Sequence, residues 1–192
     1  MFKVYPTAKI IVEELDKDNL DWLKSHELPS NIDCGCGTTH VVFKHGENGD
    51  IGDFTFIHCR KLQLGEGVHI APRVTIVGTG SVTIGDYSTI APGVVIYTST
   101  PDLRFGTNKY AEKFVLKEGD VEIGRNVFIG CGVVIPYGTF IPDNTVIGAG
   151  VTLSSKALEF LRKSTKQVSW IFQKQGTDGI SMTIREMGWK PK

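Results

Sequence analysis

An aliphatic residue returns at nearly every sixth position through the middle of this chain, and a glycine, alanine or proline often follows it. One series runs from Ile51 to Ile96 and a second runs from Ile123 to Leu153. A hexapeptide period of this kind is typical of a solenoid, in which short strands stack around one continuous core. The β-branched anchors favour strands, and the Gly, Asn and Asp residues between them favour turns. The pattern therefore predicts an all-β solenoid over residues 51–155.

One long interruption separates the two series. Ile123 follows Ile96 by 27 positions, where six would complete the period. Residues 97–122 are therefore expected to leave the solenoid as an extruded loop. A long excursion from a regular scaffold is more often functional than accidental, so this loop is a candidate part of a binding site.

The two flanks of the repeat break its rhythm. Residues 1–50 are expected to form an N-terminal cap, with a short helix at residues 16–26 and irregular first turns in the glycine-rich stretch that follows. Residues 156–192 are expected to begin as a C-terminal helix, because Ser154 or Ser155 can cap it, and to end in a tail with a short strand.

Composition narrows the classes of function. The 192 residues contain 21 Lys and Arg and 21 Asp and Glu, so the net charge is zero. Nucleic acids and anionic membranes demand a basic surplus, so neither is expected as the main partner. No apolar run approaches the ~18 residues of a membrane span and no secretory signal is present, which favours a cytoplasmic protein. Cys34, Cys36 and His40 lack a second ligand pair at zinc spacing, so no metal site is expected.

From Ile70 to Lys156 the chain resembles the hexapeptide-repeat acyltransferases, above all the maltose and galactoside O-acetyltransferase branch. The matching text includes IGDYSTIAPGVVIYTSTPDL before the loop and an IGAG-x4-SK ending after it. The resemblance implies a left-handed parallel β-helix of triangular cross-section. It also implies a homotrimer with sites between adjacent subunits, acetyl-CoA as co-substrate, and a sugar or nucleotide-linked sugar as acceptor.

The resemblance implies a place for the cofactor. In these enzymes the pantetheine arm lies along the coils after the loop, where small residues admit it to the backbone and the amide groups there can bond it or an oxyanion. A lysine near the end of the repeat meets a CoA phosphate. The corresponding positions here are Cys131, Gly132, Ala149, Gly150, Ser155 and Lys156.

The catalytic end departs from the family pattern. The branch carries a base histidine in a Thr-His-Pro context at the start of the loop, and Pro101 occupies its place here. An asparagine and an aspartate one coil earlier become Arg73 and Gly78. The remaining candidate catalytic residues are His58, which the period places two coils below the loop root, and Asp102 in the loop.

Four other residues are candidates for binding the acceptor. Arg73 and Arg104 could hold the diphosphate of a nucleotide-linked sugar, and Tyr97 and Tyr110 could stack against a sugar ring. Several alternatives stay open. His58 could be a turn histidine, Asp102 could make an Asx turn, and the acceptor atom could be oxygen or nitrogen. The chain could also be a non-catalytic trimeric scaffold, whereas a zinc site of the carbonic anhydrase type would need three ordered histidines that the repeat does not supply.

Overall fold

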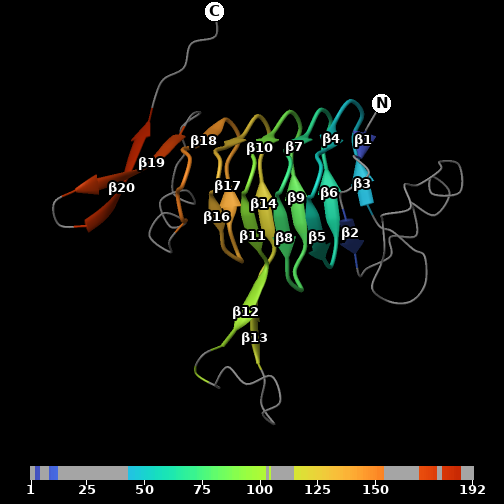
Figure 1. Cartoon of the computed structure of the whole chain (residues 1–192), viewed down its shortest axis with the longest axis horizontal. Helices are drawn as coiled ribbons and strands as arrows, with labels where there is room; N and C mark the ends of the chain where they lie inside the picture. Colours follow the sequence, from blue (N-terminus) through green and yellow to red (C-terminus); the bar gives the residue numbers. More distant parts are fainter. Residues whose placement is uncertain are drawn as a thin grey trace, which may run out of the picture.

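The computed structural model describes residues 3–4, 9–12, 43–102, 104, 115–153, 169–176 and 179–186. Within these ranges the backbone forms a left-handed parallel β-helix whose short strands stack side by side along one axis (Figure 1). Among the described residues, no helix has the length and apolar character that crossing a bilayer requires. The predicted all-β solenoid is confirmed.

Three parallel sheets make up the sides of the solenoid. Sheet A contains β1 (Lys3–Val4), β4 (Asp50–Ile51), β7 (His69–Ile70), β10 (Thr89–Ile90), β15 (Phe128–Ile129) and β18 (Thr145–Ile147). Sheet B contains β2 (Lys9–Val12), β5 (Phe56–Cys59), β8 (Thr75–Val77), β11 (Val95–Tyr97) and β16 (Val134–Ile135). Sheet C contains β3 (Phe43–His45), β6 (Leu62–Leu64), β9 (Val82–Ile84), β14 (Val121–Ile123) and β17 (Phe140–Ile141).

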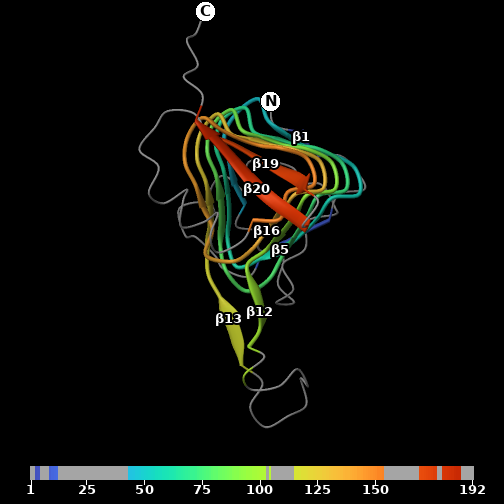
Figure 2. The same cartoon turned by 90° about the vertical axis from the view of Figure 1, so that its left-hand side faces the viewer.

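The chain visits the sheets in the order C, A, B, so each coil contributes one strand to each sheet. Coil 1 is β3–β4–β5, coil 2 is β6–β7–β8, coil 3 is β9–β10–β11, and coil 4 is β14–β15–β16. Strands β17 and β18 begin coil 5. The turns between the sheets line up into three edges, which we call the A–B, B–C and C–A edges (Figure 2).

The six-residue period arises because each anchor stacks on the anchor of the next coil. In sheet A, Ile70 pairs with Ile51 below and Ile90 above. In sheet B, Ile76 pairs with Ile57 and Ile96 in the same way. These side chains are fully buried, and burial of one stabilises the fold by about 1.5–3 kcal/mol. Strand alternation turns the residue before each anchor outward, which makes that residue available for function.

The interruption leaves the solenoid at the B–C edge. Strand β11 ends at Tyr97 and β14 begins at Val121, so the excursion spans residues 98–120, two residues shorter at its C-terminal end and one at its N-terminal end than the sequence predicts. Its base is an antiparallel pair, β12 (Ser99–Pro101) with β13 (Leu116–Glu118), which projects from one edge in Figures 1 and 2. We call this pair the loop hairpin.

The ends of the solenoid are closed by additional strands. Coil 1 already begins at β3, ahead of residue 51, and β1 and β2 pair with β4 and β5. At the other end, β19 (Ser169–Gly176) pairs in parallel with β18, and β20 (Gly179–Glu186) pairs antiparallel with β19. The tail thus holds two eight-residue strands where one short strand was expected. The helices expected at residues 16–26 and after residue 156 lie outside the described residues.

Gly78 offers a test of how the loop hairpin is anchored. Its φ is +129°, and a Cβ there would lie 2.6 Å from the Ser99 backbone nitrogen. Gly138 is a matched control, because its φ is +67° and a Cβ would meet nothing within 4 Å. Gly138→Ala should cost about 1–2 kcal/mol of unfolding free energy from its left-handed backbone. Gly78→Ala should cost at least about 1 kcal/mol more, because it also displaces Ser99.

The measurement is urea unfolding followed by circular dichroism at one fixed protein concentration. Equal losses of unfolding free energy in the two variants would show that the close approach of Gly78 to Ser99 does not hold the hairpin.

Candidate active site

The predicted cofactor positions come together on the A–B edge. Cys131 and Gly132 form the turn of coil 4, and Ala149 and Gly150 form the turn directly above it in coil 5. The Gly132 backbone amide donates to the Pro92 carbonyl at 3.1 Å, and the Gly150 amide donates to the Cys131 carbonyl at 2.8 Å. The six-residue period therefore stacks these turns one per coil.

In the upper part of this edge, one position of each turn carries no side chain. Every coil has one residue with a φ between +58° and +71° here, and coils 1 and 2 carry Phe54 and Arg73 at that position. Coils 3 to 5 carry Gly93, Gly132 and Gly150, which we call the glycine track. A Cβ on Gly132 or Gly150 would meet nothing within 4 Å. Packing therefore does not require glycine at these two positions. The missing side chain leaves the backbone there open to a ligand.

The sequence suggested that backbone amide groups in and beside the glycine track could bond a ligand, but the structure shows them bonded to other coils. The Gly130 amide donates to the Ile147 carbonyl at 2.8 Å, and the Gly132 and Gly150 amides are engaged between coils. These bonds hold each coil on its neighbour, so the three amide groups are not available to a pantetheine arm or an oxyanion. A ligand on the track would instead pack against the exposed residues Cys131 and Ala149 and the glycine Cα atoms.

The root of the loop hairpin is held by the B–C turns of coils 1 and 2. Thr98 is buried, and its hydroxyl accepts from the Gly80 amide at 3.0 Å. The Glu118 carboxylate accepts from the Thr79 hydroxyl at 2.6 Å and from the Arg60 guanidinium at 3.4 Å. These contacts tie both strands of the hairpin to the B–C edge.

Asp102 is an anchor of the loop. Its side chain is only 2% exposed, and Arg104 donates to it from Nε at 3.0 Å to both carboxylate oxygens and from Nη2 at 2.5 Å. Lys117 lies 3.5 Å away across the hairpin. The Arg104 side-chain hydrogen bonds hold the pKa of Asp102 well below its ordinary value, with smaller help from the Arg104 amide and Lys117. A carboxylate in this state is a weak base, which argues against the catalytic role that the sequence suggested.

His58 lies where the period places it. On the outer face of sheet B it is in register with Val77, which is in register with Tyr97 at the start of the loop. The Tyr97 ring packs edge-on against Tyr137 of the next coil, with centroids 6.2 Å apart. His58 is partly exposed, so it can be reached from this face.

The predicted acceptor-binding residues do not meet within one chain. Arg73 is exposed on the A–B edge, whereas Tyr97 and Arg104 lie at the B–C edge, so the width of sheet B separates them. The Arg104 guanidinium is also hydrogen-bonded to the Asp102 carboxylate. Tyr110, Ser155 and Lys156 lie outside the described residues, as do the cysteines and histidine weighed as a metal site.

The structure reveals one polar pair that the sequence analysis did not select. His69 Nδ1 lies 2.5 Å from Asp50 Oδ1 on the outer face of sheet A. Both residues immediately precede a sheet A anchor, Ile70 and Ile51, so the six-residue period would have placed them in register. The spacing of the anchors in the sequence was therefore sufficient to find this pair.

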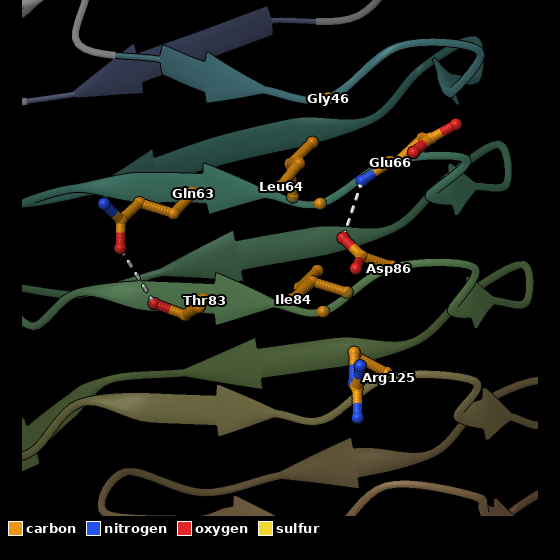
Figure 3. Close-up of a pocket in the computed structure, with 10 residues that line it drawn as sticks. Gly46, Gln63, Leu64, Glu66, Thr83, Ile84, Asp86 and Arg125 are labelled. Carbon is orange, nitrogen blue, oxygen red and sulfur yellow. Dashed lines mark hydrogen bonds between the residues drawn. The ribbon is translucent and has the colours of Figure 1, made fainter.

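A groove of about 540 Å³ lies on sheet C beside the C–A edge. Figure 3 shows Glu66 and Asp86 there, where the Glu66 amide donates to Asp86 Oδ1 at 2.9 Å. Arg125 at its margin pairs with Asp143 at 3.1 Å, and the pKa of Asp143 is lowered, first by the Arg125 amide. Sheet C lies opposite the A–B edge, and the groove contains none of the predicted site residues.

Parts of this sequence are similar to proteins of known name. No protein-family model matches the chain. It is 34% identical over 115 residues to a dTDP-4-amino-4,6-dideoxy-D-glucose acyltransferase from Escherichia coli, covering 56% of this chain and 52% of the relative. It is 36% identical over 128 residues to the galactoside O-acetyltransferase of Escherichia coli K12, covering 66% of this chain and 62% of the relative. The chain thus spans between half and two thirds of the length of these curated relatives.

Solved structures share the fold. An N-acyltransferase from Bacillus cereus, solved as a variant with dTDP-4-amino-4,6-dideoxyglucose and coenzyme A, has a TM-score of 0.62 at 16% identity, covering 97% of this chain and 81% of that chain. A maltose O-acetyltransferase from Clostridium difficile 630 has a TM-score of 0.54 at 23% identity, covering 77% and 72%. This chain is thus similar in sequence to curated sugar O- and N-acyltransferases and has the fold of hexapeptide-repeat acetyltransferases. The resemblance drawn from the sequence motifs is confirmed, including its maltose and galactoside branch.

The Asp102–Arg104 pair predicts a pH-dependent hairpin. Because the pKa of Asp102 is lower in the folded protein than its unfolded value of about 3.9, the pair stabilises the hairpin fully above that pH. Its effect declines as pH falls below about 3.9 and is lost only as pH passes through the lower folded-state pKa. Asp102→Asn should therefore speed amide exchange in β12 and β13 at pH 7. The difference from the parent protein should shrink below about pH 4.

Hydrogen exchange read by mass spectrometry, corrected for intrinsic rates, measures this directly. Asp143→Asn is the control, since it breaks a similar pair at another edge and should leave hairpin exchange unchanged. No difference at pH 7, or a difference at pH 3 as large as that at pH 7, would contradict the role assigned to Asp102.

Proposed function

We propose that this chain is an acyl-CoA-dependent acyltransferase that modifies a sugar, with acetyl-CoA as donor. The acceptor is a hydroxyl or amino group of a nucleotide-linked sugar used for surface polysaccharide. The observation that carries the proposal is the sequence likeness to two relatives named for sugar acyl transfer, one to a galactoside and one to a dTDP-linked amino sugar. The similarly folded Bacillus cereus enzyme binds coenzyme A and that nucleotide sugar. Acyl-CoA is made inside cells, so the proposed location is the cytoplasm.

The glycine track is the proposed donor site. Its open backbone over coils 3 to 5 suits a narrow, flexible arm such as pantetheine, which would lie along Cys131, Gly132, Ala149 and Gly150. Ser155 and Lys156 follow the last of these turns in sequence, and Lys156 is proposed to meet a CoA phosphate.

The proposed site needs two copies of the chain. The glycine track lies on the A–B edge and the loop hairpin on the B–C edge, so sheet B stands between them in one molecule. The outer face of sheet B carries a partly exposed row in which Phe56, Thr75, Val95 and Val134 are in register. This mostly apolar row supports self-association. A homotrimer would bring the loop of one copy over the track of the next.

The loop side of this shared site supplies the proposed acceptor contacts. Tyr97 and Tyr110 would stack against the sugar, and Arg73 of the track copy would hold phosphate. Arg104 is proposed to act through Asp102, by fixing the hairpin. An amino acceptor needs less help from a base than a hydroxyl does, since it has a lone pair once it is deprotonated.

Blocking the track tests the donor site. Coil 1 carries Phe54 at the turn that Gly132 occupies in coil 4, with φ values of +58° and +66°, so the fold tolerates a phenylalanine in this backbone conformation. Gly132→Phe should abolish the rise in thermal midpoint that coenzyme A produces, because the ring covers the track. Gly138→Phe at the B–C edge is the matched control, with φ +67° and equally open space, and should keep the rise.

The same thermal titration tests the alternative of a non-catalytic scaffold. A parent protein whose midpoint does not respond to coenzyme A would favour the scaffold and reject the donor site. A response that survives Gly132→Phe would move the donor elsewhere on the molecule.

Turnover tests the acceptor class. Acetyl-CoA is incubated with the protein and a panel of dTDP- and UDP-linked amino and neutral sugars, and release of free CoA thiol is followed with a thiol-reactive dye. The exposed Cys131 contributes a background that is recorded before acceptor is added. We expect acceptor-dependent thiol release with at least one nucleotide sugar and an acylated product of the matching mass. Thiol release that is the same without acceptor would reject sugar transfer.

A further inference from the structure

We propose that the Asp50–His69 pair is the general base of this site: Asp50 orients His69, and His69 takes the proton of the acceptor. This inference rests on the proposed function and names a residue that neither the relatives' names nor the sequence motifs supply. It begins from geometry. His69 Nδ1 lies 2.5 Å from Asp50 Oδ1, a distance that requires a proton between the two atoms.

That contact selects the tautomer of the ring. With Nδ1–H donated to the Asp50 carboxylate, the Nε2 lone pair is left free to accept a proton. The carboxylate also stabilises the imidazolium that forms when Nε2 is protonated. The side chain of His69 is 46% exposed, and no described residue is seen to pair with Nε2. The pair therefore has the two features that a base needs, a fixed orientation and access to a substrate.

The pair also lies on sheet A, which borders the edge that carries the proposed donor site. The outer row of sheet A runs through Asp50, His69, Thr89, Phe128 and Val146, one residue per coil. Each of these residues precedes its own turn on the A–B edge. His69 is one coil, about 4.8 Å, below the coil of Gly93, the lowest residue of the glycine track. Along its own strand it is three residues, about 10 Å, from Pro72 at the edge. A sugar fits in this interval.

The chemical character of the row changes along the solenoid axis. Coils 1 to 3 present the acid, the histidine and a small hydroxyl residue, Thr89, whereas coils 4 and 5 present Phe128 and Val146. Phe128 is 46% exposed. A polar sugar suits the lower part and the acyl and pantetheine groups suit the upper part. Thr89 is small enough to leave the space between His69 and the track open.

The reaction balances with the groups named. His69 Nε2 accepts the proton of the acceptor O–H or N–H as the oxygen or nitrogen bonds to the thioester carbon. The tetrahedral intermediate then breaks its C–S bond, and the CoA thiolate leaves. The imidazolium returns the proton to the thiolate, so acyl-CoA and acceptor become the acylated sugar and free CoA.

Kinetics of matched variants test the assignment. His69→Gln should lower kcat by about 100-fold or more, as expected for loss of a positioned base, while the shift of thermal midpoint with coenzyme A is kept. Asp50→Asn should lower kcat by about tenfold or more, because the ring loses its tautomer and its charge partner. Asp143→Asn is the control: it breaks a similar inter-coil pair at the C–A edge and should keep parent kcat.

The split between kcat and KM separates catalysis from a purely structural pair. A positioned base acts on the reacting atoms, so His69→Gln and Asp50→Asn should both lower kcat while the KM for acyl-CoA stays near the parent value. A His69→Gln variant that keeps more than about a tenth of parent kcat, losses confined to KM, or a larger loss in His58→Gln would overturn the proposal.

A second measurement distinguishes failure of this proposal from failure of the proposed function. The chain has five histidines, so ¹⁵N-histidine NMR, with His69 assigned through His69→Gln, reports its tautomer. We expect Nδ1–H, and a shift of the His69 signals on addition of dTDP-4-amino-4,6-dideoxyglucose. An Nε2–H tautomer, or signals that the sugar leaves in place, would reject the dyad even where the parent protein turns over an acceptor. If the parent turns over none, the proposed function fails and the NMR result alone decides the dyad.

Discussion

The stacking of one isoleucine on the next is the constraint on which this structure depends. Ile70 between Ile51 and Ile90, and Ile76 between Ile57 and Ile96, are fully buried and in register. A slip of one residue would turn these side chains to the outside, so the register is strongly specified. Every outward position then has a fixed coil and a fixed face. The glycine track, the loop root and the Asp50–His69 pair all inherit their places from this register.

The fold was accessible to sequence reasoning because the same physics repeats in every coil. The period located the stacked core, the extruded loop to within two residues at each end, and the position of His58 beneath Val77. It failed where the repeat ends. The tail pairs with β18 through strands β19 and β20, whose register depends on a distant partner instead of a local period. Likewise, β3 already belongs to coil 1 although its sequence lacks the anchor pattern.

The site was harder to predict, because a motif names residues but not what they touch. From the sequence Asp102 could be a catalytic carboxylate or the start of an Asx turn, and only the structure shows Arg104 and Lys117 beside it. The amides of Gly132 and Gly150 looked available until the coils were stacked. The pairing of His69 was missed because its partner Asp50 lies 19 residues away, at the equivalent position of the coil before. The last two contacts join neighbouring coils, and the period itself could have supplied them, whereas the partners of Asp102 lie within the loop, where the period gives no register.

The loop and the glycine track belong to opposite edges of sheet B, so the proposed site combines two copies of the chain. Co-expression of Gly132→Phe chains with chains in which residues 105–114 are replaced by a short linker measures this directly. Each variant alone should be inactive. Random mixed trimers should regain roughly a quarter of parent activity, because an intact loop then meets an intact track on a neighbouring copy. Mixed assemblies no more active than the separate variants would contradict the account.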